Sequence, residues 1–91
     1  MELNQLKTFL AVASNGSFLQ AASRLHVTQS TVSSRIQGLE ESLGAKLFVR
    51  NRSGAKLTQA GQRFVHHAKS VILTMQQARH DVGLPSRYRA S

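Results

Sequence analysis

The sequence has no cysteine, no tryptophan, a single proline and only four acidic residues in 91 positions. Without cysteine, the chain can form no disulfide framework, no thiolate zinc site and no thiol nucleophile. It has no apolar run approaching the ~18 residues of a membrane span. Its start at Met1–Asn4 lacks the basic and apolar blocks of a secretory signal. We therefore expect a cytoplasmic protein that does not span a membrane.

A chain of this length allows one small domain, which buries only about 60 per cent of its unfolded surface and leaves little room for an enclosed active site. No nucleophile with a neighbouring base and no glycine-rich phosphate loop can be assembled from the sequence. His66 and His67 are adjacent on a predicted helix, so they should point about 100° apart, and no further ligand stands at metal-binding spacing. We expect no enzyme, no cofactor and no metal site.

All of the surplus positive charge lies in the second half of the chain. The formal net charge is +8, and residues 1–43 contribute none of it because three Lys and Arg balance three Glu. Residues 44–91 carry nine Lys and Arg against Asp81 alone, and four of these cations fall between Lys46 and Lys56. Such a cluster predicts a polyanionic partner. Composition leaves open whether that partner is a nucleic acid or an anionic membrane surface.

Two helices are predicted at the start of the chain. Apolar residues of Leu3–Ala13 recur at helical spacing, and Asn15-Gly16 supplies a stop in which glycine adopts a left-handed cap. Ser17 and Gln20 then have the spacing of a capping box, and a short apolar stripe follows in Phe18–Leu25.

A third helix is predicted from Thr28, which can cap it, to Gly44, which is placed to end it. Its apolar face spans Val32–Leu43. Only about three residues join the second and third helices, so the two must cross, and Ala21 and Ala22 allow their backbones to approach closely. This arrangement is typical of a helix-turn-helix.

The exposed face of the third helix carries small hydrogen-bonding side chains in its first turns, from Thr28 to Gln37. An ordinary solvated face favours Glu and Lys, whereas Ser and Thr are poorer helix formers. Gln can pair with an adenine edge, Ser and Thr reach bases or phosphates, and a helix N-terminus favours a phosphate. We interpret this face as one that reads DNA.

A small basic hairpin is predicted directly after the third helix. Lys46–Arg50 is short and partly β-branched, Asn51–Gly54 is typical of a turn, and Ala55–Leu57 can pair back as a second strand. A hairpin in this place makes a winged variant of the helix-turn-helix. Three cations could then reach the DNA backbone or minor groove: Arg50, Arg52 and Lys56.

A last, long helix is predicted from the cap at Thr58, with apolar residues at alternating steps of four and three, as in a heptad stripe. The stretch to Val82 is roughly 37 Å long at 1.5 Å per residue, more than a small core can cover. We therefore predict a dimerising helix, with a frayed tail as the alternative. Gly83–Pro85 is expected to end it. The predicted dimerisation residues are Phe64, Ala68, Val71, Ile72, Met75, Ala78 and Val82.

Over nearly its whole length, the chain resembles the DNA-binding segment of the LysR-type transcriptional regulators. Each matching fragment is weak alone, but the ordered set is specific. The fragments are Leu3-Asn4-Gln5-Leu6, Phe9, Val12-Ala13, Gly16-Ser17-Phe18, Ala21-Ala22, Leu25, Thr28-Gln29, Val32-Ser33, Ile36, Leu39-Glu40, Leu43-Gly44, Leu47-Phe48, Arg50, Leu57-Thr58 and Ala60-Gly61.

The resemblance implies a winged helix-turn-helix over residues 1–57, whose third helix enters the major groove while the wing touches the adjacent minor groove. A linker helix over residues 58–83 would pair two subunits. Members of the family usually continue into an effector-binding domain that senses a small molecule, and they act as tetramers. Residues 84–91 are therefore expected to be a linker toward such a domain, which is absent from this chain. A small-molecule effector is expected only if that domain exists.

The chain departs from the family pattern at a few positions. Ser30 and Ser34 stand where proline and arginine are frequent, Arg35 comes one step later, and Ser53 stands where the wing often has arginine. We assign the base edges to Gln29, Ser30, Thr31 and Ser34. We assign the DNA backbone or minor groove to Ser17, Thr28, Ser33, Arg35, Arg50, Arg52 and Lys56.

The predicted fold is mainly α: a winged helix-turn-helix of three helices and a small hairpin, followed by a long dimerising helix. The predicted function is sequence-specific binding of double-stranded DNA, as a homodimer on an inverted repeat, in a bacterial regulator that has no membrane partner. The main rival is a helical protein-interaction module whose basic surface serves only solubility. A membrane-surface role for the last helix and an enzyme are less well supported.

Overall fold

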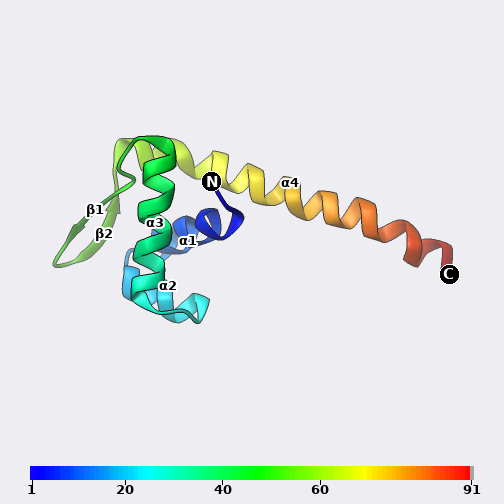
Figure 1. The fold of residues 1–91 in the computed structure, drawn as a ribbon, viewed down its shortest axis with the longest axis horizontal. Coiled ribbons are helices and arrows are strands. Elements are labelled where there is room, and N and C mark those ends of the chain that lie inside the picture. The colour runs from blue at the N-terminus through cyan, green and yellow to red at the C-terminus, as the bar shows by residue number, and fades with distance from the viewer. Residues whose placement is uncertain (91) are drawn as a thin grey trace.

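Four helices and one hairpin account for nearly all of the chain. The computed structural model describes residues 1–90, and the side chains of residues 1–83. In chain order the elements are α1 (Leu3–Asn15), α2 (Phe18–Leu25), α3 (Gln29–Leu43), β1 (Phe48–Asn51), β2 (Gly54–Leu57) and α4 (Gln59–Ala90). The first three helices form a head, from which the hairpin and the far end of α4 project in opposite directions (Figure 1). This confirms the predicted winged helix-turn-helix with a long final helix.

The predicted helix starts are confirmed by their caps. The backbone N–H of Gln20 donates to Ser17 Oγ at 3.2 Å at the start of α2. The backbone N–H of Thr31 donates to Thr28 Oγ1 at 3.1 Å at the start of α3. Each bond satisfies one of the N–H groups that a helix start leaves without a partner.

The first three helices each end at a residue whose backbone is in the left-handed conformation. Gly16 ends α1 with φ 69° and Gly44 ends α3 with φ 70°, as the sequence predicts. His26 ends α2 with φ 59°, a conformation that is uncommon for a residue with a side chain. It allows the short turn between α2 and α3.

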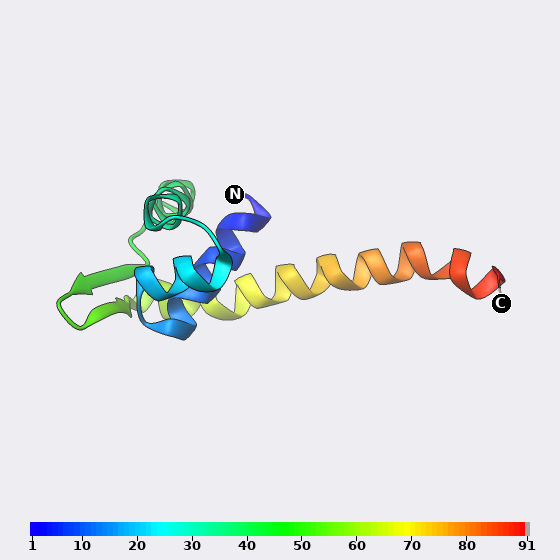
Figure 2. The ribbon, with the colours of Figure 1, turned by 90° about the horizontal axis from the view of Figure 1, so that it is seen from below.

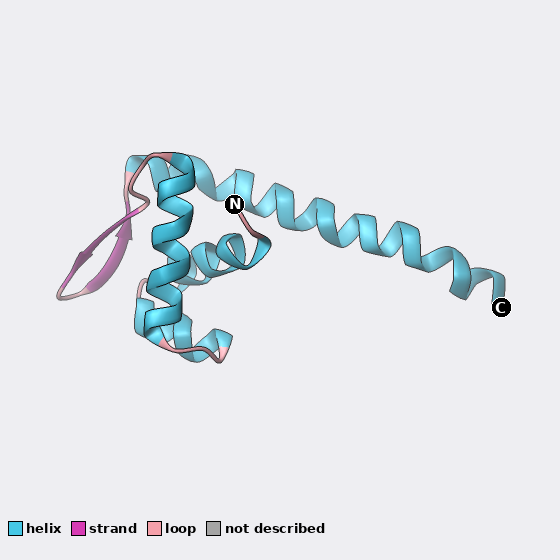
Figure 3. Ribbon diagram, in the orientation of Figure 1, coloured by secondary structure: helices cyan, strands magenta, loops and turns pink. Residues whose placement is uncertain are grey.

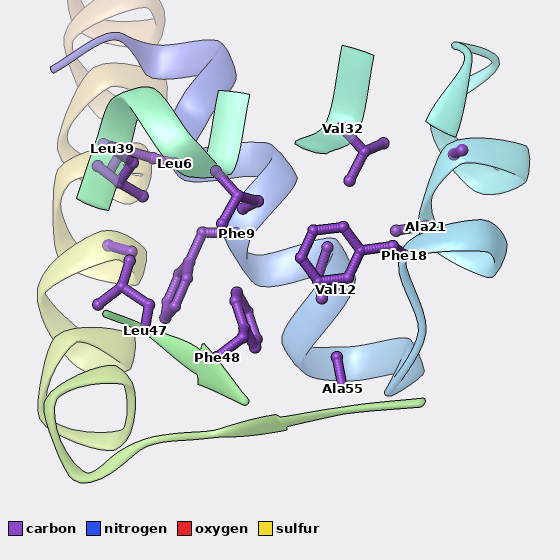
Figure 4. Close-up of a cluster of buried hydrophobic side chains, with 13 residues drawn as sticks. Leu6, Phe9, Val12, Phe18, Ala21, Val32, Leu39, Leu47, Phe48 and Ala55 are labelled. Atoms are coloured by element: carbon purple, nitrogen blue, oxygen red, sulfur yellow. The ribbon is translucent and has the colours of Figure 1, made fainter. Parts of the chain in front are cut away.

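The head is built around the four phenylalanines of the sequence. Phe9 of α1 lies at the centre, with its ring centroid 5.4 Å from that of Phe48 and 5.2 Å from that of Phe64. Phe48 in turn lies 5.8 Å from Phe18 of α2. Figure 4 shows Phe18, Phe48 and Phe9 among the aliphatic side chains of the core. The other buried apolar residues are Leu6, Val12, Ala21, Ala22, Val32, Ile36, Leu39, Leu47, Ala55 and Ala68.

The hairpin is antiparallel, with Phe48 opposite Leu57 and Asn51 opposite Gly54 (Figure 3). It is also tied to the turn between α1 and α2, because the Ala55 N–H donates to the Gly16 carbonyl at 2.9 Å. The approach is so close that a Cβ on Gly54 would lie 2.2 Å from that carbonyl oxygen. The direction of the wing is therefore set by the head.

The last helix begins at the predicted cap. Thr58 Oγ1 accepts the Gly61 N–H at 3.0 Å and donates to the Lys46 carbonyl at 2.6 Å, which holds the start of α4 beside the start of the hairpin. The first turns of α4 then pack on α1, and the rest extends away from the head in both views (Figures 1 and 2). No described helix is both long and apolar enough to cross a membrane.

The expectation that Gly83–Pro85 ends the last helix is wrong, because α4 continues to Ala90. Glycine and proline lower helix stability by about 1 and 3 kcal/mol, respectively, but neither makes a helix impossible. A proline inside a helix removes one backbone donor, and its ring crowds the carbonyl four residues before it, so it costs stability without excluding a helix. The linker predicted at residues 84–91 is thus helical as far as Ala90, and residue 91 lies outside the described part of the chain.

Gly61→Ala should destabilise the fold. A Cβ there would lie 2.3 Å from the Leu47 carbonyl oxygen, so α4 would have to move away from the hairpin. We expect a loss of about 1–3 kcal/mol in the free energy of unfolding, measured by urea denaturation. Gly83→Ala on the same helix is the control, since nothing lies within 4 Å of its Cβ and the change should be neutral or slightly stabilising. Equal effects of the two substitutions would contradict this packing.

Candidate nucleic-acid interface

One face of α3 presents a row of small and medium polar side chains to solvent. Ser30, Ser34 and Gln37 are exposed and follow one another at steps of four and three, so they share one stripe of the helix. Gln29 is exposed in the first turn. The structure therefore brings together three of the four residues that we assigned to base edges: Gln29, Ser30 and Ser34.

Thr31, the fourth of these residues, has a different setting. It is half-buried, and its hydroxyl lies 2.9 Å from Thr28 Oγ1, the same oxygen that accepts its backbone N–H. Ser30 Oγ lies 3.1 Å from that oxygen as well. Thr28, Ser30 and Thr31 thus form a hydroxyl cluster that caps α3, next to the free N–H groups that favour a phosphate.

Arg35 is turned away from the exposed stripe. Its Nη1 donates to Thr8 Oγ1 at 3.3 Å, and the Thr8 hydroxyl, which is fully buried, donates to the Asn4 carbonyl at 2.7 Å. This bond ties the middle of α3 to α1. The sequence assigned Arg35 to the DNA backbone, and it offered no sign of this contact between residues 27 positions apart.

The wing cations point in different directions. Arg50 lies opposite Ala55 and Lys56 lies opposite Val49, so the side chains of Arg50 and Lys56 emerge from opposite faces of the hairpin. Arg50 shares the face of Phe48, toward the core, and its guanidinium carbon lies 4.1 Å from the centroid of the Phe18 ring. Arg52 stands in the two-residue turn at the tip.

A groove lies between α3 and β1 and is lined by residues of both elements. The half-buried Ser33 and the exposed Gln37 line it from α3, and Arg50 lines it from the wing. At one end Lys46 pairs with Glu40 at 3.7 Å, and the Glu40 carboxylate also accepts the Leu47 N–H at 2.8 Å. The groove therefore joins the two surfaces that the sequence assigned to DNA.

Two further residues, Gln37 and Phe18, line the groove without a role predicted from the sequence. Gln37 was noted among the polar residues of α3 but was not assigned a role. Its spacing from Ser30 and Ser34 would have placed it on the same stripe. No sequence signal pointed to Phe18, because its contact with Arg50 joins residues far apart in the chain. Ser17, by contrast, lies where predicted, as the cap of α2.

The predicted dimerisation residues divide into two groups. Ala68 is 0% exposed within its own head, so its assignment to a dimer surface is wrong, and Phe64 and Ile72 are half-buried against the same core. The other four residues are exposed: Val71, Met75, Ala78 and Val82, with Val82 81% exposed. The sequence alone did not show where the head ends along the helix.

The histidines of α4 do not form a metal site with the side chains that the structure describes. The rings of His66 and His67 lie with their centroids 4.0 Å apart, closer than expected for adjacent helical residues. No group of three His, Asp or Glu side chains in residues 1–83 is placed to hold a metal ion. Both rings are exposed, which agrees with solvated positions.

Comparison with known proteins relates the chain to one family. The pattern of the bacterial regulatory helix-turn-helix proteins of the lysR family matches residues 3–62. The HTH-type transcriptional regulator HdfR of Escherichia coli is 43% identical over 88 residues, which are 97% of this chain and 32% of HdfR. The chain thus spans about a third of the length of this relative.

Solved structures with the same fold include complexes with DNA. The chain is similar to the CbnR DBD in its crystal structure with DNA, with a TM-score of 0.86 and 38% identity over 100% of both chains. It is also similar to Vibrio fischeri DarR in complex with DNA, with a TM-score of 0.90 and 30% identity over 97% of this chain and 30% of DarR.

Proposed function

Because the chain belongs to the lysR family of bacterial helix-turn-helix regulators, we propose that it is the DNA-reading part of a transcription regulator. The observation that carries this proposal is the groove that joins the polar stripe of α3 to Arg50 of the wing. The polar stripe can contact base edges, and Arg50 can contact phosphates. Because one core holds them side by side, they are better explained as a surface that binds a DNA duplex than as a surface that only contacts solvent. The described relatives in complex with DNA support the same reading.

In this proposal, α3 enters the major groove, which is wide enough for a helix and shows a distinct pattern for each base pair. Gln29, Ser30 and Ser34 reach base edges, and Gln37 extends their stripe. The cap of α3 at Thr28 meets a phosphate with its free N–H groups. Thr31 supports that cap and has the least direct access to a base, because it is half-buried.

The remaining predicted contacts are with parts of the DNA next to the major groove. Arg52 at the hairpin tip extends to the adjacent minor groove, where cations are attracted by the negative potential. Lys56 reaches the backbone from the outer face of the hairpin, and Ser17 presents the start of α2 to a phosphate. Ser33 faces the groove beside the wing.

Selection of bound duplexes from a random pool at moderate salt tests the proposal directly. We expect sequencing to show an enriched inverted repeat, since two copies related by a two-fold axis read two half-sites. Binding without enrichment would leave only the electrostatic attraction and contradict base reading. No binding at all would favour the rival, a protein-interaction module with a basic surface.

Gln29→Ala should weaken binding to the selected site by about 1–3 kcal/mol and change binding to random DNA little, because it removes a base contact and no charge. Titration of both duplexes in fluorescence anisotropy measures the two effects. Gln77→Ala is the matched control, since Gln77 is exposed on α4 outside the head. Equal losses on the two duplexes would rule out a base contact.

We further propose that α4 pairs two copies of the chain in antiparallel orientation. Apart from the buried Ala68, the apolar stripe consists of residues 64, 71, 75, 78 and 82, and its spacing is compatible with a partner helix that runs in the opposite direction. An antiparallel pair centred near position 73 therefore sets Val71 against Met75 and Val82 against Phe64. Phe64 borders an apolar groove with Leu43 and Leu47, which Val82 of the second copy would cover.

Met75→Glu should convert the dimer to a monomer. An unpaired carboxylate between the two apolar helices costs several kcal/mol. Since each 1.4 kcal/mol changes a dissociation constant about tenfold, we expect the dissociation constant of the dimer to rise by more than about tenfold. Sedimentation equilibrium without DNA measures it. Leu73→Glu is the control, because Leu73 is 53% exposed and lies on the opposite face of the helix. A dimer that survives Met75→Glu, or that Leu73→Glu disrupts equally, would show that another face is used.

The proposal also concerns the longer protein in which this chain would work. The chain covers 32% of HdfR, so we infer that it works within a longer protein whose remaining length senses a small molecule. Dimers formed through α4 would then assemble into tetramers through that additional domain. The proposed location is the bacterial cytoplasm, where the protein is bound to the nucleoid.

A further inference from the structure

We infer that Phe18 is a positioning residue, which holds the Arg50 guanidinium in the groove beside α3 so that it binds a DNA phosphate there instead of entering the minor groove. This inference rests on the proposed DNA binding. It separates two arginines of the wing that sequence reasoning treated alike. Arg50 has a fixed place against the head, whereas Arg52 stands in the turn at the hairpin tip.

The contact has the geometry of a cation over an aromatic face. The guanidinium carbon of Arg50 lies 4.1 Å from the centroid of the Phe18 ring, well inside the ~6 Å limit for such pairs. Among the cations whose side chains the structure describes, Arg50 alone lies over a ring in this way.

The ring itself is firmly held. Phe18 is only 6% exposed, and its ring meets that of Phe48 at 77°, with the centroids 5.8 Å apart. Phe48 and Arg50 lie two residues apart on one face of β1, so both side chains point toward Phe18. The core therefore determines where the guanidinium can lie.

A guanidinium has five N–H donors in its plane, and a ring over which its central carbon lies does not use them as hydrogen bonds. These N–H groups can form two parallel bonds to phosphate oxygens. Across the groove stand Ser33 and Gln37 of α3, which contribute further donors.

The nearest acid in the groove does not neutralise Arg50. Glu40 lines the same groove, but its carboxylate pairs with Lys46 at 3.7 Å and accepts the Leu47 N–H at 2.8 Å. The charge of Arg50 is therefore available to an anion that enters between the helix and the wing.

A double-mutant cycle tests whether Phe18 acts through Arg50. Phe18→Leu keeps an apolar side chain but removes the ring face, and we expect DNA binding to weaken about two- to fivefold, the range for an exposed cation–aromatic pair. In an Arg50→Ala background the same change should have no further effect. In an Arg52→Ala background, which removes the same charge from the tip, the full loss should persist. Equal losses in both backgrounds would overturn the inference, because Phe18 would then act only through the core.

The class of DNA contact is tested with Arg50→Ala alone. A phosphate contact predicts equal weakening on all sequences and a salt dependence that flattens by about one unit in log–log slope. A minor-groove contact instead predicts a loss that depends on whether A·T or G·C pairs lie under the wing. That second result would contradict the phosphate assignment.

A measurement on the free wild-type chain covers the case in which Phe18→Leu does not fold. The ring current of Phe18 should shift the Arg50 Nε proton upfield of those of Arg52 and Arg79 in NMR spectra. Unshifted resonances would show that the ring does not hold Arg50.

If the wild-type chain bound no duplex, the proposed function would fail. Binding without coupling between Phe18 and Arg50 would overturn only the positioning role.

Discussion

The contacts among the four phenylalanine rings hold this small head together. They run from Phe64 of α4 to Phe9 of α1, then to Phe48 of the hairpin and Phe18 of α2, with neighbouring centroids 5.2, 5.4 and 5.8 Å apart. One series of rings thus connects four elements that come from both ends of the sequence. Aromatic pairs of this kind add about 0.5–1.5 kcal/mol each beyond the area they bury. In a domain with so little core, the placement of the wing and of α4 depends on them.

The candidate DNA surface follows from this constraint. The polar stripe lies on α3, and the wing cations lie on a hairpin whose strands form no sheet with another strand, so the relative position of stripe and cations is set through the core. Two close backbone approaches add to the rings: Gly54 against the carbonyl of Gly16, and Gly61 against the carbonyl of Leu47. Each requires a residue without a side chain. Packing at the centre of the head thereby decides which side chains border the groove at its surface.

Local interactions explain why much of this was predictable. Ser17 and Thr28 cap helices through bonds to residues three positions away, and Gly16 and Gly44 end helices through their own backbone conformation. Such features depend on a few neighbouring residues, so the sequence displays them directly. The stop expected at Gly83–Pro85 was a weaker inference of the same type. It rested on intrinsic preferences, which lower the stability of a helix without forbidding it.

Local patterns along the chain were enough to predict the order of helices and hairpin, the helix ends within the head, the confinement of positive charge to the second half and the family resemblance. Three contacts emerged from the folded chain alone: Arg35 bonds to Thr8, Arg50 lies over the Phe18 ring, and Ala68 is buried in the head. Each of these joins residues far apart in the chain. Periodicity reports which face of a helix is apolar, but the neighbour that covers the face depends on how all elements pack together.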